Sequence, residues 1–350
     1  MVVAYIICAP ALFMPYRMRI LYINAFSYLL HAPFKLFGKL ARFLLNQLNI
    51  VEYDRGGSAI ALSPMIRPVS RQPGSRVAIL YSGGTDSTCA AAVLAERFET
   101  IHLLTFYEHA TRHSPVPTKN VQLLRKYFAG VTFTHTVLSV DALVRYFWYE
   151  RFAQTLRFHG FLSLSTPGYS SLSWHVRTIH FCLENGITHV ADGLTRELMH
   201  FPGHVDEVVN MLRVLYQRYG ISYENPVRDW QTPPDHQFID QVLINRHTSE
   251  FVLGDTSSAQ RKTTGQYLFD IGIFPHPNLK GTATDFSMQH DCYPFALYNL
   301  LAFWGHLTRE PYPVFTKKIS NLMAFKIEAA HALLDSYRSE NTTALSAMVK

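Results

Sequence analysis

A short run of glycines and hydroxylated residues is the first feature of the sequence that could do chemistry. The run is Ser82-Gly83-Gly84-Thr85-Asp86-Ser87, and it lies between an apolar stretch (76–81) and an alanine-rich stretch that reaches residue 98. This order predicts a strand, a tight turn and a helix. Glycines let the backbone approach an anion closely, and the N–H groups at a helix N-terminus favour phosphate. The run therefore predicts a phosphate-binding loop.

The loop differs from a Walker A loop. A Walker A loop carries a lysine between its last glycine and the following Ser or Thr. No lysine stands between Gly84 and Ser87 in this sequence. A nucleotide bound here must therefore be held in a different way.

The same six residues resemble the SGGxDS signature of the PP-loop ATP pyrophosphatases, also called the adenine nucleotide alpha hydrolase superfamily. Members bind ATP in this loop, cleave it between the α- and β-phosphates, and transfer AMP to a carbonyl or carboxylate oxygen. The resemblance implies that the ATP contacts Tyr81, Ser82, Gly83, Gly84, Thr85, Asp86 and Ser87. Within this set Asp86 and Ser87 are the catalytic candidates, and Asp86 is the candidate ligand of Mg²⁺. Magnesium also fits on general grounds, because phosphate-bound Mg²⁺ typically uses one or two carboxylates plus waters.

The elements after the loop alternate between strand and helix. Strand patterns occupy 101–107, 131–140, 188–191 and 221–225, and helical patterns occupy 120–128, 173–185 and 205–219. Gly186 is a natural C-cap for helix 173–185. This alternation predicts an α/β fold with a doubly wound parallel sheet, whose ligands bind at the carboxyl ends of the strands. The superfamily has such a fold; here an N-terminal helical extension and a helical C-terminal cap are expected in addition.

Two strand ends supply further candidates by resemblance. In this superfamily the end of the second strand borders the adenine, which implies that Thr105, Phe106 and Tyr107 lie close to the base; core packing is an equal alternative for the two aromatic residues. The strand 188–191 leads into Asp192-Gly193-Leu194-Thr195-Arg196-Glu197. This run resembles the superfamily's loop in which a glycine, here Gly193, admits the α-phosphate.

Arg177 and Cys292 are the catalytic candidates outside these loops. Arg177 on helix 173–185 could contact a phosphate, although an exposed or ion-paired arginine is the simpler alternative. Cys292 lies beside His290 and Asp291, which are residue types that activate a thiolate. A packed, unreactive cysteine is the alternative for Cys292. Cys89 and Cys182 fall in helical patterns and are expected to be buried.

The resemblance covers about residues 76–230. The order after the fourth strand, a proline-containing loop, a helix and another strand, is similar to that of 7-cyano-7-deazaguanine synthases. Those synthases carry a C-terminal zinc site of four cysteines, and the corresponding region here contains only Cys292. Zinc by that route is excluded, and the nitrile-forming activity does not follow from the resemblance.

Charge and cysteine usage suggest the partners and the compartment. The 32 Lys and Arg residues outnumber the 26 Asp and Glu residues, which gives a formal charge of +6. This excess suits an anionic partner such as tRNA, and an ordinary basic surface equally well. Four cysteines far apart in the sequence, with no CxxC pair, fit a reducing cytosol.

The N-terminal residues could contact a membrane surface. Neither uncharged run, 2–16 or 20–34, is convincing as a bilayer span. In the stretch 34–49, one helical face carries Phe37, Leu40, Leu44 and Leu48, and the other carries Lys35, Lys39 and Arg42. Such a helix could lie on a membrane or pack on its own domain. The expected division is an extension (1–53), a linker (54–76), a nucleotide-binding domain (77–230) and a C-terminal substrate or cap region (231–350).

The resemblance implies an ATP-dependent adenylating enzyme that uses Mg²⁺. It would activate a carbonyl or carboxylate acceptor, a small molecule or a modified base, for attack by a nitrogen or sulfur nucleophile. Two alternatives remain open. One is a tRNA-modifying thiolase of the same superfamily, and the other is a non-enzymatic nucleotide-binding protein associated with a membrane.

Overall fold

The computed structural model describes residues 71–109, 116–196, 200–231, 262–279, 298, 306, 309–340 and 344–349. The predicted N-terminal extension with its helix 34–49, the predicted linker up to residue 70 and Cys292 all lie outside these residues. The four-part division of the chain therefore stays a prediction. Among the described helices, none is both long enough and apolar enough to span a bilayer.

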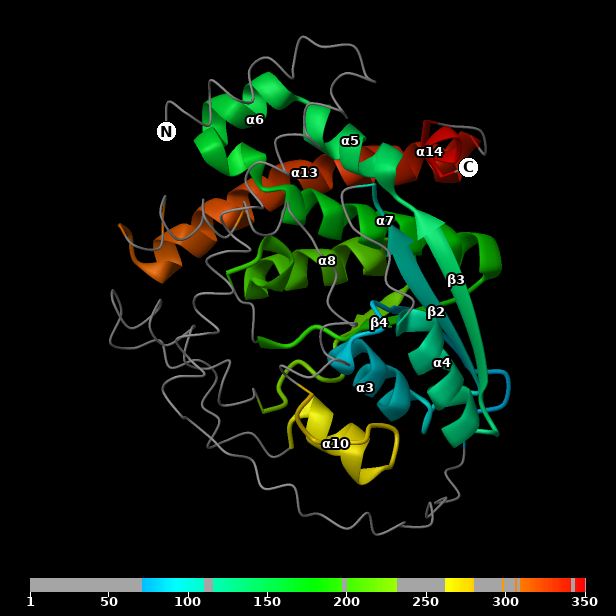
Figure 1. The fold of residues 1–350 in the computed structure, drawn as a ribbon. Helices are drawn as coiled ribbons and strands as arrows, with labels where there is room; N and C mark the ends of the chain where they lie inside the picture. The colour runs from blue at the N-terminus through cyan, green and yellow to red at the C-terminus, as the bar shows by residue number, and fades with distance from the viewer. Residues whose placement is uncertain are drawn as a thin grey trace. The chain divides into compact units, whose positions relative to one another are not determined.

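Five strands form one all-parallel sheet in the order β3-β2-β1-β4-β5. Figure 1 labels three of them, β2, β3 and β4. The strands are β1 (Arg76–Leu80), β2 (Thr100–Tyr107), β3 (Thr132–Ser139), β4 (His189–Asp192) and β5 (Ser222–Glu224). The prediction of an α/β fold with a doubly wound parallel sheet is confirmed. The strand order reverses between β1 and β4, and ligands of such sheets bind at the carboxyl ends of the strands at this switch point.

Both faces of the central strand are buried. Val77 and Ile79 point into one hydrophobic cluster, and Ala78 points into the other, because successive side chains of a strand alternate between the two faces. Parallel strands covered on both sides are apolar at nearly every position. This explains why β1 is a continuous apolar run in the sequence.

One face of the sheet, the α3 face, is covered by α3 (Thr85–Leu94), α4 (Val116–Tyr127) and α10 (Thr264–Asp270). The three alanines at 90–92 in α3 are fully buried. Their small side chains allow this helix to lie close to the strands, so the start of α3 is held at the edge of the sheet. Figure 1 shows α10 beside α3, although the two helices are far apart in the sequence.

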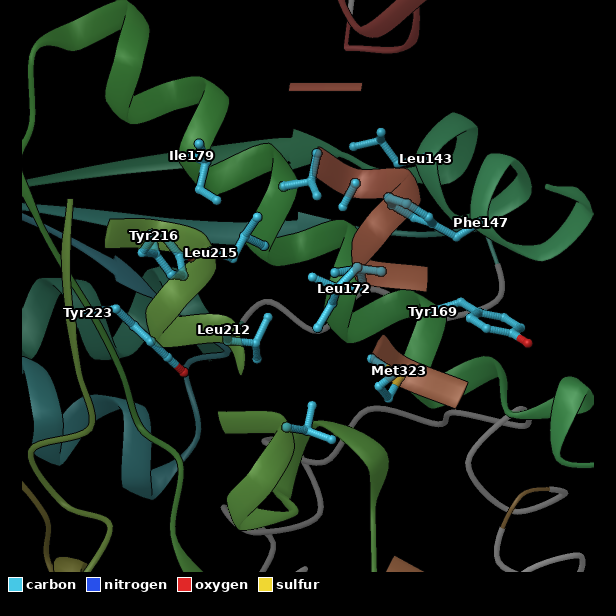
Figure 2. Packing of buried hydrophobic residues seen from close by; sticks show 14 of the residues in the cluster. Leu143, Phe147, Tyr169, Leu172, Ile179, Leu212, Leu215, Tyr216, Tyr223 and Met323 are labelled. Carbon is cyan, nitrogen blue, oxygen red and sulfur yellow. The ribbon is translucent and has the colours of Figure 1, made fainter. Parts of the chain in front are cut away.

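The opposite face, the α7 face, is covered by α5 (Asp141–Tyr149), α7 (Thr166–Asn185), α8 (Asp206–Arg218) and α13 (Tyr312–Glu340). Figure 2 shows Leu172 of α7, Leu212 of α8 and Met323 of α13 in one cluster. Full burial of one such side chain contributes about 1.5–3 kcal/mol. The described residues also form α6 (Phe152–His159), α14 (Ala344–Met348) and the 3₁₀ helices η1 (Gly160–Leu164) and η3 (Pro202–His204). The predicted C-terminal helix is confirmed, and it packs on the α7 face.

Two helices start earlier than the sequence analysis predicted. α7 begins at Thr166 instead of 173 and α4 at Val116 instead of 120, and each has a proline, Pro167 or Pro117, at its second residue. Proline is favoured in the first turn, where its missing N–H is not needed. The predicted end of α7 is confirmed: Gly186 has a φ of 61°, which is the left-handed conformation of a C-cap glycine.

A buried lysine joins α13 to the end of α5. The side chain of Lys326 is fully buried, and its ammonium donates a hydrogen bond to the carbonyl of Glu150. The ammonium also lies 5.4 Å from the ring centroid of Tyr169. Burial lowers the pKa of Lys326 to about 8. The charged form is therefore held in the fold at a cost in stability at neutral pH.

We expect the free energy of unfolding of the protein to depend on pH through this lysine. Between pH 8 and 10.5 the unfolded chain keeps a proton that the folded chain has lost, so raising the pH favours the folded state. Across this range the free energy of unfolding of the wild type should rise by about 2 kcal/mol relative to Lys326→Met, which has no such proton. Urea denaturation of both proteins at several pH values measures the difference. A difference that stays constant with pH would contradict the shifted pKa.

Candidate functional site

The predicted phosphate loop lies between β1 and α3, as the sequence analysis expected. Gly83 in this loop has a φ of +79°, and a Cβ at this position would lie 2.5 Å from the Cα of Pro117. Only glycine fits a left-handed backbone packed so closely on α4. The side chain of Asn120, also in α4, donates a hydrogen bond of 2.6 Å to the Gly83 carbonyl. The start of α4 therefore fixes the shape of the loop.

Hydrogen bonds of the serine hydroxyls connect the loop to the start of α3. The Oγ atoms of Ser82 and Ser87 lie 3.1 Å apart, and the Gly84 N–H donates to Ser82 Oγ at 3.3 Å. Ser87 Oγ donates to the Gly84 carbonyl at 3.2 Å. Gly84 is the N-cap of α3 and has no side chain that could cap the helix. The N–H groups of its first turn have no partners within the helix and can meet an anion.

The backbone at Gly84 leaves room for a ligand. Among the described residues, a Cβ at Gly84 would meet a single atom within 4 Å, the Ser82 Oγ at 3.4 Å. Gly84 is thus unlike Gly83, whose missing side chain is explained by protein packing. A phosphate oxygen could approach the Gly84 backbone where any other residue would place a side chain. The loop therefore fits an anion of the kind that the sequence predicted.

The loop after β4 lies directly on the first turn of α3. A Cβ at Gly193 would lie 2.4 Å from Ser87 N and 2.7 Å from the carbonyl carbon of Asp86. The predicted candidates Gly193, Asp86 and Ser87 are therefore brought together. The contact occurs at the switch point of the sheet, where the loops after β1 and β4 are neighbours.

Asp192 holds this second loop in place. Its carboxylate accepts hydrogen bonds from Tyr223 Oη, from Asn225 Nδ2 at 2.8 Å and from the Leu194 N–H at 3.0 Å. Burial raises the pKa of Asp192, and the bonds from Tyr223 and Asn225 lower it. With both oxygens engaged, Asp192 serves to position Gly193, and Asp86 remains the loop's candidate metal ligand.

Asp86 is contacted by a residue far along the chain. Thr264 Oγ1 in α10 donates a hydrogen bond of 2.5 Å to Asp86 Oδ1. Burial raises the pKa of Asp86, and this hydrogen bond lowers it. Among the residues that the structure describes, no group of three or more His, Cys, Asp or Glu side chains could hold a metal. A single carboxylate beside a phosphate loop fits Mg²⁺, which keeps several waters and shares phosphate oxygens.

The candidate residues at the end of β2, Thr105 and Phe106, lie on opposite faces of the sheet. Thr105 is on the α3 face, where its hydroxyl donates to the Tyr81 carbonyl at 2.8 Å and lies 2.9 Å from His135 Nε2. Phe106 is on the α7 face and stacks on Trp174 at 6.1 Å between ring centroids. The structure thus brings Thr105 to the start of the loop but does not bring Phe106 there. Tyr81 reaches the site through its backbone, because its ring is buried and its hydroxyl lies 3.2 Å from Thr88 Oγ1.

A buried carboxyl group at the end of β2 was missed by the sequence analysis. Glu108 accepts hydrogen bonds of 2.9 Å from Ser170 Oγ and from Trp174 Nε1, both in α7. Burial raises the pKa of Glu108, and the nearby Asp141 raises it further. No sequence pattern connects residues more than sixty positions apart, so this cluster was not predictable. It lies with Phe106 and Trp174, on the α7 face.

Arg177, the other described catalytic candidate, is not at the loop. Arg177 is on the α7 face, where one amino group lies 2.8 Å from His180 Nδ1 and the other donates to the Val349 carbonyl at 3.2 Å. Cys89 and Cys182 are buried, as predicted, and burial raises the pKa of Cys182 to about 12. Cys292 lies outside the described residues, so its role as a nucleophile stays a prediction.

Comparisons with known proteins do not identify a family for this chain. No family model matches the sequence. No curated protein matches it either. Among solved structures, a predicted subunit of a tRNA methyltransferase from Methanocaldococcus jannaschii is 20% identical, over 44% of this chain and 68% of that chain, with a TM-score of 0.30. A likeness at this level carries no argument about family or activity, and the fold rests on the sheet topology itself.

The Gly193 contact can be tested by substitution. Gly193→Ala places a methyl group against the backbone of Ser87, which cannot move aside, so we expect a loss of about 3 kcal/mol in the free energy of unfolding. Gly130→Ala is the matched control, because its nearest neighbour is the flexible end of Arg71 at 3.2 Å. Urea denaturation of both variants measures the losses. Equal losses would show that the two loops are not in close contact.

Proposed function

We propose that this protein is an ATP-dependent adenylating enzyme that cleaves ATP to AMP and pyrophosphate. The observation that carries the proposal is the Gly84 backbone at the uncapped start of α3, with Gly193 seated on the same helical turn. A strand, a glycine-rich turn and a helix start in this arrangement form an anion site. The resemblance of Ser82-Gly83-Gly84-Thr85-Asp86-Ser87 to the SGGxDS signature supports cleavage between the α- and β-phosphates.

In the proposed reaction each loop has its own task. The first-turn N–H groups of α3 and the hydroxyls of Ser82 and Ser87 would bind the β- and γ-phosphates, which leave as pyrophosphate. Gly193, whose Cβ position is filled by the backbone of Ser87, would hold the loop after β4 against the first turn of α3. An acceptor oxygen attacks the α-phosphorus as the bond to the bridging oxygen breaks, and a nitrogen or sulfur nucleophile then displaces AMP. Positioning and electrostatic stabilisation would provide most of the rate enhancement.

Asp86 would hold the Mg²⁺ ion of this reaction. When bound, the ion would supply positive charge to the pyrophosphate leaving group. The chain's own contribution is to fix the carboxylate at the N-terminal turn of α3 through the hydrogen bond from Thr264. Thr105 would fix the backbone of Tyr81 immediately before the loop.

The proposal predicts AMP and pyrophosphate as products. Purified full-length protein should form them from Mg-ATP when offered its acceptor, which a screen of small acids, modified bases and tRNA can identify by pyrophosphate exchange. Asp86→Asn should lower the rate by about 100-fold or more, because a neutral amide is a poor magnesium ligand. Chromatographic separation of AMP from ADP measures both rate and product.

Asp335→Asn is the matched control for this experiment. Asp335 is an aspartate of α13 that pairs with Arg218 on the surface of the α7 face, away from the loop. We expect this variant to keep the wild-type rate. ADP as the product would contradict the proposal, and so would wild-type activity in Asp86→Asn.

A further inference from the structure

A segment from the C-terminal half of the chain is built onto the phosphate loop. In α10, Leu268 is fully buried in the hydrophobic core of the α3 face. A Cβ at Gly265 would lie 2.4 Å from the Pro277 carbonyl oxygen and 3.8 Å from Thr85 Cγ2. The turn after α10 therefore folds back tightly on the helix start, and that start faces the loop.

Thr264 is the residue of this segment whose side chain contacts Asp86 of the loop. Thr264 is 5% exposed, and its hydroxyl donates to Asp86 Oδ1 at 2.5 Å. The preceding residue, Thr263, caps α10 by accepting a hydrogen bond of 3.1 Å from the Gln266 N–H. The cap fixes the helix start, and the buried Leu268 fixes the helix against α3. Thr264 is thus presented to Asp86 by a rigid unit.

A hydrogen-bond donor on one oxygen of the Asp86 carboxylate determines which ligand the other oxygen can bind. A hydrogen bond to Oδ1 fixes the rotation of the carboxyl group and leaves Oδ2 for a metal ion. Hydrogen-bond partners of this kind orient metal-ligating carboxylates, and their loss typically costs 10–100-fold in metal affinity or activity.

We propose that Thr264 is a positioning residue that orients the Asp86 carboxylate for a divalent cation bound together with the nucleotide. This inference rests on the proposed function, since it takes the loop as a Mg-ATP site. It adds that the start of α10 contributes to the site through Thr264, and that Thr264 acts only through Asp86. The hydroxyl is the essential group, because a valine of the same shape could not donate the hydrogen bond.

The test measures nucleotide binding with and without metal in full-length protein. The probe is α,β-methylene-ATP, whose α–β linkage cannot be cleaved, titrated calorimetrically in Mg²⁺ and again in EDTA. Thr264→Val removes the hydroxyl and keeps the shape, whereas Thr264→Ser keeps the hydroxyl. Asp270→Asn is the control on the same helix, because Asp270 pairs with Lys262 at the surface.

We expect Thr264→Val to reduce the tightening of nucleotide binding by Mg²⁺ about 10-fold or more, with affinity in EDTA unchanged. Thr264→Ser and Asp270→Asn should keep the wild-type enhancement. An equal loss of affinity in Mg²⁺ and in EDTA would reduce Thr264 to a packing residue and overturn the inference. So would an unchanged enhancement in Thr264→Val, which leaves the proposed function standing. A wild-type protein that binds no nucleotide in either condition would overturn both.

Discussion

The contact between Gly193 and the first turn of α3 is the constraint on which the site depends. The reversal of strand order between β1 and β4 makes the two following loops neighbours, and a Cβ at Gly193 would lie 2.4 Å from Ser87 N. The loops can meet this closely for two reasons. The alanines at 90–92 let α3 lie near the strands, and Asp192 ties the second loop to Tyr223 and Asn225 of the β5 region.

The two faces of the sheet have separate roles. The α7 face holds the larger hydrophobic cluster together with Arg177 and Glu108, whereas the α3 face holds the loop and α10. The alternation of strand side chains decides to which face each residue belongs. Thr105 and Phe106 are adjacent in sequence, yet one bonds the residue before the loop and the other stacks on α7. A family resemblance that names neighbouring residues therefore cannot by itself place both in one site.

Local signals made most of the fold predictable from the sequence, and the missing parts are long-range. The loop, the strands and the Gly186 cap follow from residues close together, because glycine conformations and apolar runs act locally. The prolines at the starts of α4 and α7 were such a signal and were overlooked. The bond from Thr264 to Asp86 joins residues 178 positions apart, and only the packing of α10 on α3 creates it. The sequence around a threonine at a helix start does not predict such a distant partner.

Charge neutralisation is the remaining problem for a phosphate loop without a lysine. Two of the described cations near these loops are paired with carboxylates: Arg196 with Asp206 and Asp229, and Lys262 with Asp270. The positive charge of each of these side chains is therefore partly neutralised by its carboxylate partner. The helix N-terminus supplies only about half an elementary charge, which falls short of a triphosphate. Under the proposed function, a divalent cation at Asp86 would supply the missing charge, so the orientation of that carboxylate would decide how well the triphosphate is bound.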